Sequence, residues 1–168
     1  MKKKTLLLTG TTGFIGYEFL LFALSNNFSV IDILKEKNRK NKKIRKLKNS
    51  YPSKYKNIFF FNNKDLEKKL KGTKVDYFIN FATLYSNSHS HSQIGDFIES
   101  NILFPTLIYD IIHNNTKKII NFGSMMQHSR TQKLISNNLY AATKNAFEMI
   151  SNYYSNTNNK TKFYNIKF

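Results

Sequence analysis

The residues best suited to chemistry are a tyrosine and a lysine four positions apart. Tyr140 and Lys144 lie in the segment Tyr-Ala-Ala-Thr-Lys, and this spacing places two side chains on one face of a helix. A nearby ammonium group lowers the pKa of a tyrosine from about 10 towards neutrality, which suits the phenol for proton transfer. Ser124, at the end of an expected strand, would hydrogen-bond the same substrate oxygen. The three residues predict proton transfer at a carbonyl coupled to hydride transfer, although Tyr-x-x-x-Lys alone also fits a solvated helix face.

A glycine-rich segment near the amino terminus, Thr9-Gly10-Thr-Thr-Gly13-Phe-Ile-Gly16, forms a second candidate site. Glycine allows a tight turn and lets the backbone approach a ligand without an intervening Cβ. The free N–H groups at the start of a helix attract anions. The spacing Gly-x-x-Gly-x-x-Gly differs from the Gly-x-Gly-x-x-Gly dinucleotide fingerprint. It predicts a turn that binds a pyrophosphate, and a tight structural turn would use the same residues.

Alternating strands and helices would position both sites. The expected strands are 5–9, 29–34, 57–61, 75–82, 118–122 and 162–168, and the expected helices are 14–25, 65–70, 94–113 and 139–154. Strands separated by helices form right-handed crossovers and a parallel sheet that is covered on both faces. The fold class is therefore a doubly wound α/β domain. Ligands bind such sheets at the carboxyl ends of the strands, here at the polar turns after the first, fourth and fifth strands.

The opening segment Thr-Gly-x-x-Gly-Phe-Ile-Gly resembles the signature of the extended short-chain dehydrogenases/reductases, also known as the NAD-dependent epimerase/dehydratase family. The resemblance implies a Rossmann-type domain over residues 1–168 that binds NADP or NAD. It makes Ser124, Tyr140 and Lys144 catalytic, and it lets Tyr140 and Lys144 touch the cofactor as well. The residues it places along the cofactor pyrophosphate are Gly10, Gly13, Phe14, Ile15 and Gly16.

The same resemblance gives cofactor roles to other positions. Asn80-Phe-Ala82 matches the fourth strand of the family, so Ala82 and Thr83 would border the cofactor. Asn63 occupies the place of an aspartate that binds the adenine. Asn101 matches a helix asparagine that supports the site, and a purely structural role fits it equally well.

The second strand bears on the choice between the two cofactors. NAD-binding relatives end this strand with an acidic residue that binds the adenosine ribose, and by count that place falls on Leu34. Asp32 lies two residues too early. A missing carboxylate followed by the cation of Lys35 favours NADP, with Lys35 and Arg39 as contacts for its 2′-phosphate. The alternative, that Lys35 merely begins a basic loop, stays open.

Two further segments narrow the resemblance. Residues 120–128, Ile-Asn-Phe-Gly-Ser-Met-Met-Gln-His, and 138–148 are similar to a branch that includes CDP-abequose and CDP-paratose synthases. That branch implies reduction of the 4-keto group of a CDP-linked deoxysugar in O-antigen synthesis, with Ser124 and Gln127 at the substrate. For Gln127, a capped loop residue is an equal alternative. An epimerase or dehydratase of the same family, or a truncated, non-catalytic dinucleotide-binding module, would also fit.

Composition bears on other classes of function. The absence of cysteine rules out disulfides and thiolate chemistry and favours a reducing, cytoplasmic location. His89 and His91 have neither carboxylate nor cysteine neighbours, so we expect no metal site, and no apolar run is long enough for a membrane span. Much of the net charge of +17 lies in residues 35–48, which hold nine basic residues and one glutamate. Because the aromatic residues lie mainly in apolar runs elsewhere, we expect a solvated surface helix there and no nucleic-acid partner.

The chain ends at Phe168, inside the sixth expected strand, whereas relatives continue into a smaller domain that grips the nucleotide sugar. We therefore expect either a fragment of a longer protein or a shortened product without a C-terminal substrate domain. In the second case the catalytic residues would be idle, because catalysis needs the substrate held against them. The family also suggests a homodimer formed through the helices that carry Asn101 and Tyr140.

Overall fold

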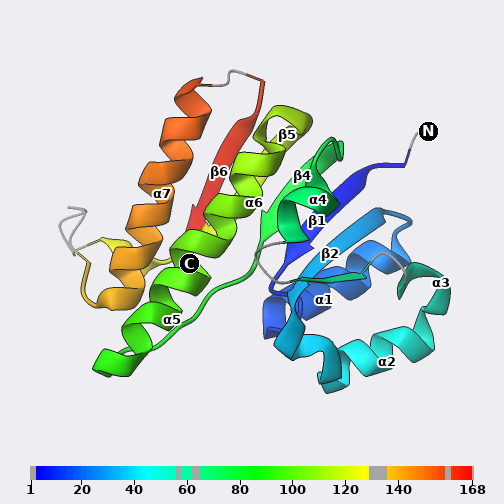
Figure 1. Ribbon diagram of the computed structural model, residues 1–168, viewed down its shortest axis with the longest axis horizontal. Helices are drawn as coiled ribbons and strands as arrows, with labels where there is room; N and C mark the ends of the chain where they lie inside the picture. Colours follow the sequence, from blue (N-terminus) through cyan, green and yellow to red (C-terminus); the bar gives the residue numbers. More distant parts are fainter. Residues whose placement is uncertain (1–2, 56–57, 62–64, 129–135, 158–159, 168) are drawn as a thin grey trace.

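The computed structural model describes residues 3–55, 58–61, 65–128, 136–157 and 160–167. The strands form one six-stranded sheet in the order β3-β2-β1-β4-β5-β6, and every neighbouring pair is parallel (Figure 1). The bounds are β1 Thr5–Thr9, β2 Ser29–Lys35, β3 Ile58–Phe61, β4 Val75–Asn80, β5 Thr116–Gly123 and β6 Lys162–Lys167. The strand order reverses between β1 and β4, which confirms the predicted doubly wound sheet.

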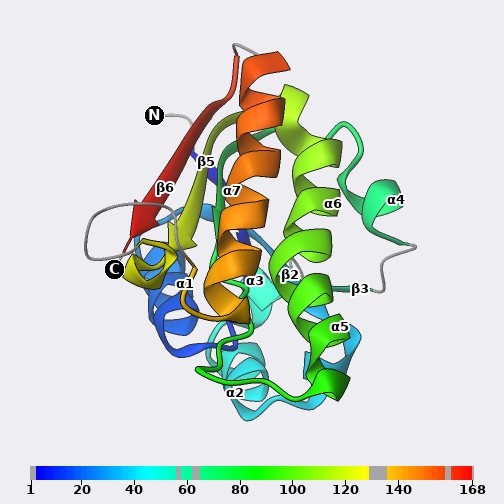
Figure 2. The ribbon, with the colours of Figure 1, turned by 90° about the vertical axis from the view of Figure 1, so that its left-hand side faces the viewer.

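Helices cover both faces of the sheet. The α-helices are α1 Phe14–Ser25, α2 Lys42–Ser50, α3 Pro52–Tyr55, α4 Leu66–Leu70, α5 Ile94–Ile98, α6 Phe104–Ile112 and α7 Leu139–Thr157. The short 3-10 segments are η1 Glu36–Lys40, η3 His91–Gln93, η5 His113–Asn115 and η6 Met125–Gln127. Helices α1 and α2 pack on one face, and α4, α6 and α7 pack on the other. Figure 2 shows α6 and α7 side by side over the sheet.

The central strand β1 shows why the apolar runs are continuous. Leu6 and Leu8 belong to the core beneath α1 and α2, whereas Leu7 belongs to the core beneath α4, α6 and α7. Successive side chains of a strand point to opposite faces. Because both faces are covered, all three leucines are buried, and the run reads as uniformly apolar.

The predicted helix over 94–113 is interrupted. A π-helical segment, η4 Glu99–Leu103, joins α5 to α6. Pro105 has no N–H and cannot donate to the carbonyl of Asn101 four residues earlier, which accounts for a break in the regular pattern. The segment turns the Asn101 side chain into the protein, where it is buried. The sequence analysis did not predict this feature.

A row of polar side chains crosses the apolar sheet near the carboxyl ends of four strands. Thr9, Asn80, Asn121 and Asn165 are register partners on β1, β4, β5 and β6. The Thr9 hydroxyl donates to Asn80 Oδ1 (2.6 Å), Asn80 Nδ2 donates to Asn121 Oδ1 (3.0 Å), and Asn121 Nδ2 donates to Asn165 Oδ1 (3.1 Å). Buried amides are costly unless they are hydrogen-bonded. This polar ladder therefore fixes how the four strands are aligned.

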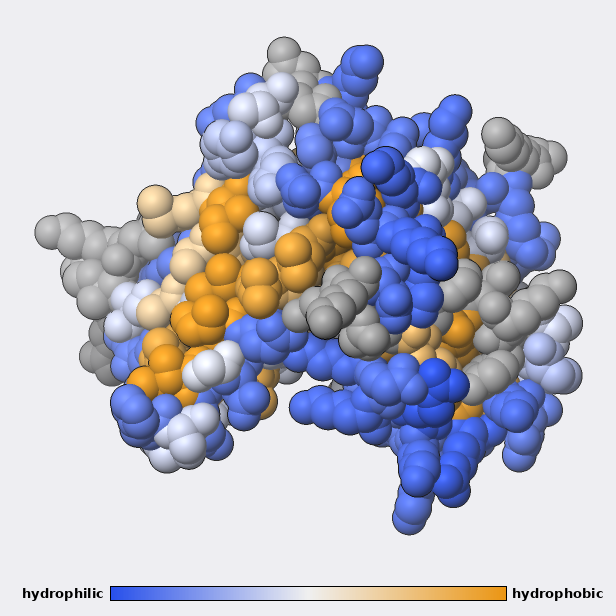
Figure 3. Space-filling view, in the orientation of Figure 1, coloured by the Kyte–Doolittle hydropathy of each residue, from blue (hydrophilic) through white to orange (hydrophobic). Residues whose placement is uncertain are grey.

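The outer surface over α5 and α6 carries an apolar strip (Figure 3). Its exposed members include Ile94, Ile98 and Leu103, which are 37%, 42% and 41% exposed. None of the helices in the described part of the chain combines the length and apolarity that a bilayer crossing demands.

Candidate active site

The reversal in strand order opens a cavity of about 840 Å³ at the carboxyl edge of the sheet, a size suited to a small-molecule ligand. The turn after β1, the end of β2, the segment after β4, the end of β5 and the start of α7 line it. The predicted cofactor and catalytic residues among its walls are Gly10, Gly13, Phe14, Ile15, Gly16, Lys35, Ala82, Thr83, Tyr140 and Lys144. Asn63 lies outside the described residues.

The glycine turn forms one end of the cavity. Gly10 has a φ of +70°, and a Cβ there would lie 2.3 Å from the backbone nitrogen of Ala82. A Cβ at Gly16 would lie 2.5 Å from the carbonyl oxygen of Gly10. Glycine is thus required where β1 approaches β4 and where α1 approaches the turn.

The start of α1 is suited to an anion. Gly13 caps the helix with its backbone alone, and no acidic side chain lies in the first turn. The first N–H groups of a helix lack partners within it, and the helix dipole favours negative charge at this end. Phe14 is 79% exposed beside this opening. The turn therefore fits the pyrophosphate of a dinucleotide.

Asp32 is buried beneath the turn and does not face the cavity. The Thr11 hydroxyl donates to Asp32 Oδ2 at 2.5 Å, and within the described residues Asp32 Oδ1 has no hydrogen-bond partner. Burial raises the pKa of Asp32 to about 7. Near pH 7 a substantial fraction of this carboxyl group is therefore neutral, which reduces its repulsion of an anion bound at the glycine turn. Leu34 lines the cavity instead, as the residue count predicted.

The two basic residues predicted to contact a 2′-phosphate, Lys35 and Arg39, have partners within the protein. Lys35 Nζ lies 3.4 Å from Glu99 Oε1, and both side chains are partly exposed. Arg39 Nε donates to Glu36 Oε1 at 2.6 Å, and Arg39 does not line the cavity. Lys43, from the predicted surface helix, donates to the carbonyl oxygen of Gly13 at 3.1 Å. The sequence analysis missed this contact between α2 and the glycine turn.

Tyr140 and Lys144 lie at the other end of the cavity, on α7. Lys144 Nζ is 5.9 Å from the centre of the Tyr140 ring and donates to the carbonyl oxygen of Phe122 at 2.8 Å. Burial lowers the pKa of Lys144 from 10.5 to about 8. The predicted pairing of phenol and ammonium on one helix face is thus present in the fold.

The pKa of Tyr140 differs from the expectation. Burial raises it above the usual value of 10.0, and hydrogen bonds with Ser124 and Thr83 act in the opposite direction. The expected lowering by a cation is not seen, because Lys144 lies over the ring and the phenol is desolvated. Ser124 directly follows β5, and its hydroxyl oxygen accepts a hydrogen bond from the Met126 N–H at 3.2 Å.

Asn101 holds the segment after β4 in place. Its Oδ1 accepts from the Leu84 N–H (2.7 Å) and the Thr83 hydroxyl (3.2 Å). Its Nδ2 donates to the Leu84 carbonyl oxygen and to the Thr143 hydroxyl, both at 2.9 Å. The amide therefore ties η4 to this segment and to α7, which is a supporting role.

Gln127, predicted at the substrate, is fully buried and does not line the cavity. Its Oε1 accepts from the Ser124 N–H at 2.7 Å, and its Nε2 donates to Asn145 Oδ1 at 2.7 Å. The side chain thus points towards α7, where Asn145 and Glu148 accept its hydrogen bonds. Within the described residues, the amide oxygen and the amide nitrogen of Gln127 both have hydrogen-bond partners in the protein, and a side-chain contact with substrate stays a prediction. Ser124 and Gln127 form a capping box at η6, and the spacing Ser-x-x-Gln in the sequence is typical of that motif.

The predicted histidine pair lies away from the cavity. His91 begins η3, and the His89 ring lies 6.2 Å from the Phe97 ring. Across the described ranges, no three His, Cys, Asp or Glu side chains gather closely enough to hold a metal ion.

The buried ammonium of Lys144 predicts a pH dependence of stability. Because its pKa is lowered from 10.5 to about 8 on folding, the unfolded chain binds the proton more tightly between these values. Stability should therefore rise with pH in this window, by a total on the order of 3 kcal/mol. Lys144→Met removes this contribution. In urea unfolding, the free energy of unfolding of the wild type should therefore increase relative to that of the variant as the pH rises above 8. Lys46→Met, at an exposed position, should not reproduce the trend, and a constant difference for Lys144→Met would contradict the prediction.

Comparison with solved structures identifies the fold. A protein described as a short-chain alcohol dehydrogenase from Burkholderia multivorans has a TM-score of 0.78 at 15% identity, covering 99% of this chain and 82% of that chain. The UDP-Glc/GlcNAc 4-epimerase from Campylobacter jejuni has a TM-score of 0.77 at 17% identity, covering 98% and 53%. The UDP-N-acetylglucosamine 4-epimerase from Methanobrevibacter ruminantium M1, in complex with UDP-N-acetylmuramic acid, has a TM-score of 0.76 at 24% identity, covering 99% and 55%. The chain thus spans about half the length of the two epimerases.

Sequence comparison identifies the family. A search of curated proteins gave no significant match. The family model for the NAD dependent epimerase/dehydratase family matches residues 6–168, which is nearly the whole chain. The matched span contains the glycine turn, Ser124, Tyr140 and Lys144, and the cavity between them fits a nicotinamide dinucleotide. The chain therefore belongs to the NAD-dependent epimerase/dehydratase family.

Proposed function

We propose that this chain carries the hydride- and proton-transfer site of an NAD(P)-dependent oxidoreductase that reduces the 4-keto group of a nucleotide-linked deoxysugar. The observation that carries the proposal is that Tyr140 and Lys144 line one end of a cavity whose other end is the glycine turn. Ser124 directly follows Gly123 in the cavity wall, and its side chain acts to lower the pKa of Tyr140. The chain spans about half of its epimerase neighbours, so the activity of the whole enzyme is part of the proposal.

Tyr140, Ser124 and Lys144 have different roles in the proposed reduction. When bound, a reduced nicotinamide supplies a hydride to C4 of the sugar. Tyr140 gives its phenolic proton to the carbonyl oxygen, which becomes the alcohol, and Ser124 orients that oxygen by hydrogen bonding. The phenolate left behind is stabilised by the Ser124 hydroxyl and by the ammonium of Lys144. Phe81 and Phe122, stacked at 4.7 Å between ring centres, form an apolar wall that limits water access.

The CDP-linked sugar rests on the resemblance of residues 120–128 and 138–148 to CDP-sugar 4-reductases. A 4-epimerase is the second candidate, favoured by the similarity to two UDP-sugar 4-epimerases. The two reactions differ in cofactor balance, since a reductase consumes NADPH in proportion to product, whereas an epimerase returns its cofactor unchanged. A non-catalytic dinucleotide-binding module would bind cofactor and do neither.

Removing the phenolic hydroxyl should separate catalysis from binding. In Tyr140→Phe the proton donor is lost, so the rate of NADPH oxidation with a CDP-linked 4-keto sugar should fall by about 10²–10⁴-fold. The dissociation constant for NADPH, measured by fluorescence titration, should rise by less than about tenfold, because one hydrogen bond is lost. Tyr153→Phe, exposed on the same helix, serves as the control. Unchanged turnover in Tyr140→Phe would refute the proposed mechanism.

We further propose that NADP is preferred over NAD and that Lys35 contacts its 2′-phosphate. Lys35→Met keeps an unbranched side chain and removes the ammonium group, which lies 5.7 Å from the centre of the Phe104 ring. Affinity for NADPH should fall by about tenfold or more, as for loss of a charged hydrogen bond, while affinity for NADH stays the same. The control is Lys40→Met, at an exposed position in η1. Equal losses for both cofactors would show that Lys35 does not discriminate between them.

We also propose a homodimer formed through the apolar strip on α5 and the exposed face of α7. Ile94, Ile98, Met149 and Tyr153 are exposed on these helices, and large exposed apolar patches are typical of interaction surfaces. Ile98→Glu should shift the protein from dimer to monomer in sedimentation velocity. A wild-type chain that is monomeric at all accessible concentrations would exclude the dimer.

A further inference from the structure

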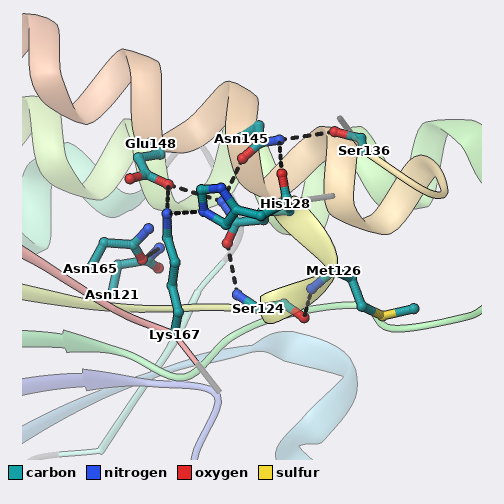
Figure 4. A network of polar contacts seen from close by, with 10 residues as sticks. Asn121, Ser124, Met126, His128, Ser136, Asn145, Glu148, Asn165 and Lys167 are labelled. Carbon is teal, nitrogen blue, oxygen red and sulfur yellow. Dashed lines mark hydrogen bonds and ion pairs between the residues drawn. The ribbon is translucent and has the colours of Figure 1, made fainter. Parts of the chain in front are cut away.

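Behind Ser124 lies a buried polar network that the proposed reaction does not use directly. It begins at Gln127 in η6, passes to Asn145 and Glu148 on α7, and ends at Lys167 on β6. Figure 4 shows Asn145, Glu148 and Lys167 together with Ser124. The side chain of Gln127 is fully buried. This buried amide therefore contacts both α7 and the backbone of Ser124, which is the predicted catalytic serine.

The partners of Gln127 fix its orientation. Gln127 Nε2 lies 2.9 Å from Glu148 Oε2. A carboxylate oxygen accepts hydrogen bonds and cannot donate them. The amide nitrogen must therefore face α7, and Oε1 must face the Ser124 N–H, 2.7 Å away. Asn145 reinforces this choice, because its Oδ1 accepts from Gln127 Nε2 while its own Nδ2 donates to the Gln127 backbone carbonyl at 3.3 Å. The amide therefore has a single orientation.

The far end of the network anchors this orientation to the sheet. Lys167 Nζ lies 3.4 Å from Glu148 Oε2 and 2.6 Å from His128 Nε2. The strand end is also packed tightly against Gln127, since a Cβ at Gly123 would lie 2.5 Å from Gln127 Oε1. The end of β5, the turn after it and α7 are thus held together around one amide.

Ser124 is held from two sides by this turn. Its N–H donates to Gln127 Oε1, and its hydroxyl oxygen accepts from the Met126 N–H. The Ser124 hydroxyl is thus fixed on its acceptor side, and the same side chain acts to lower the pKa of Tyr140. Loss of the Gln127 amide would free the Ser124 backbone and with it the direction of the hydroxyl.

We propose that Gln127 is a positioning residue: its buried amide, anchored through Glu148 and Lys167, holds the Ser124 hydroxyl against the Tyr140 phenol. The inference rests on the proposed function, in which these two hydroxyl groups act on the substrate oxygen. Gln127 itself touches neither substrate nor cofactor, because it is fully buried and does not line the cavity.

The test is a double-mutant cycle between Gln127→Met and Ser124→Ala. Methionine keeps the length and volume of glutamine without its hydrogen bonds. If Gln127 acts through Ser124, Gln127→Met should lower kcat with little change in the KM for NADPH, and it should lower kcat no further in the Ser124→Ala background. Independent, multiplicative losses would overturn the proposal.

A matched control exists in the same chain. Ser90 and Gln93 form the same capping box at η3, where both residues are exposed. Gln93→Met removes an equivalent hydrogen bond at a site away from Tyr140, so kcat should be unchanged. If both methionine variants lower kcat equally, the loss reflects general destabilisation and the proposal fails.

A second measurement does not depend on turnover. The isotope-labelled Cζ signal of Tyr140, assigned by its disappearance in Tyr140→Phe, reports the hydrogen bonding of the phenol at near-neutral pH. Gln127→Met should shift this signal in the same direction as Ser124→Ala, and Lys167→Met, at the partly exposed end of the network, should shift it less. An unshifted signal in Gln127→Met overturns the positioning role. Absence of turnover in the wild type, with these shifts present, would instead refute the proposed function alone.

Discussion

The alignment of the four strands β1, β4, β5 and β6 at their carboxyl ends is the constraint on which the site depends. The polar ladder from Thr9 to Asn165 fixes it, because each member hydrogen-bonds to the residue directly beside it on the neighbouring strand. A slip of one residue would break the ladder and turn each side chain of the strand to the opposite face of the sheet, where it would no longer match its packing partners. With the strand ends level, Gly10 meets Ala82, and Ser124 emerges beside the helix that carries Tyr140.

Desolvation governs the chemistry of the groups around the cavity. The pKa of Asp32 is raised, that of Lys144 is lowered and that of Tyr140 is raised, and burial is the largest cause in all three cases. Each group is thereby shifted towards its neutral form. For Tyr140, hydrogen bonds with Ser124 and Thr83 oppose the effect of burial, so the placement of these two hydroxyl groups controls how readily the phenol ionises.

The two supporting amides of the site work in a similar way. Asn101 comes from a π-helical segment and holds the loop that presents Thr83, whereas Gln127 comes from a single 3-10 turn and holds Ser124. In both cases an irregular backbone element directs a buried amide towards a hydroxyl-bearing residue: Asn101 accepts from the Thr83 hydroxyl, and Gln127 accepts from the Ser124 N–H. The regular strands and helices supply the frame, and these two irregular segments set the direction of the hydroxyl groups at Tyr140.

The order of strands and helices, the glycine turn and the spacing of Tyr140 and Lys144 could be predicted from the sequence, because they are local patterns of period, turn chemistry and helix geometry. For Gln127 the sequence left a substrate contact and a capped loop residue as equal alternatives, and it did not indicate the direction in which the side chain points. Only the tertiary structure decided that direction, the burial of Asp32 and the raised pKa of Tyr140. These properties depend on which distant segments remove water from a side chain or meet it across the sheet, and no local pattern in the sequence records that.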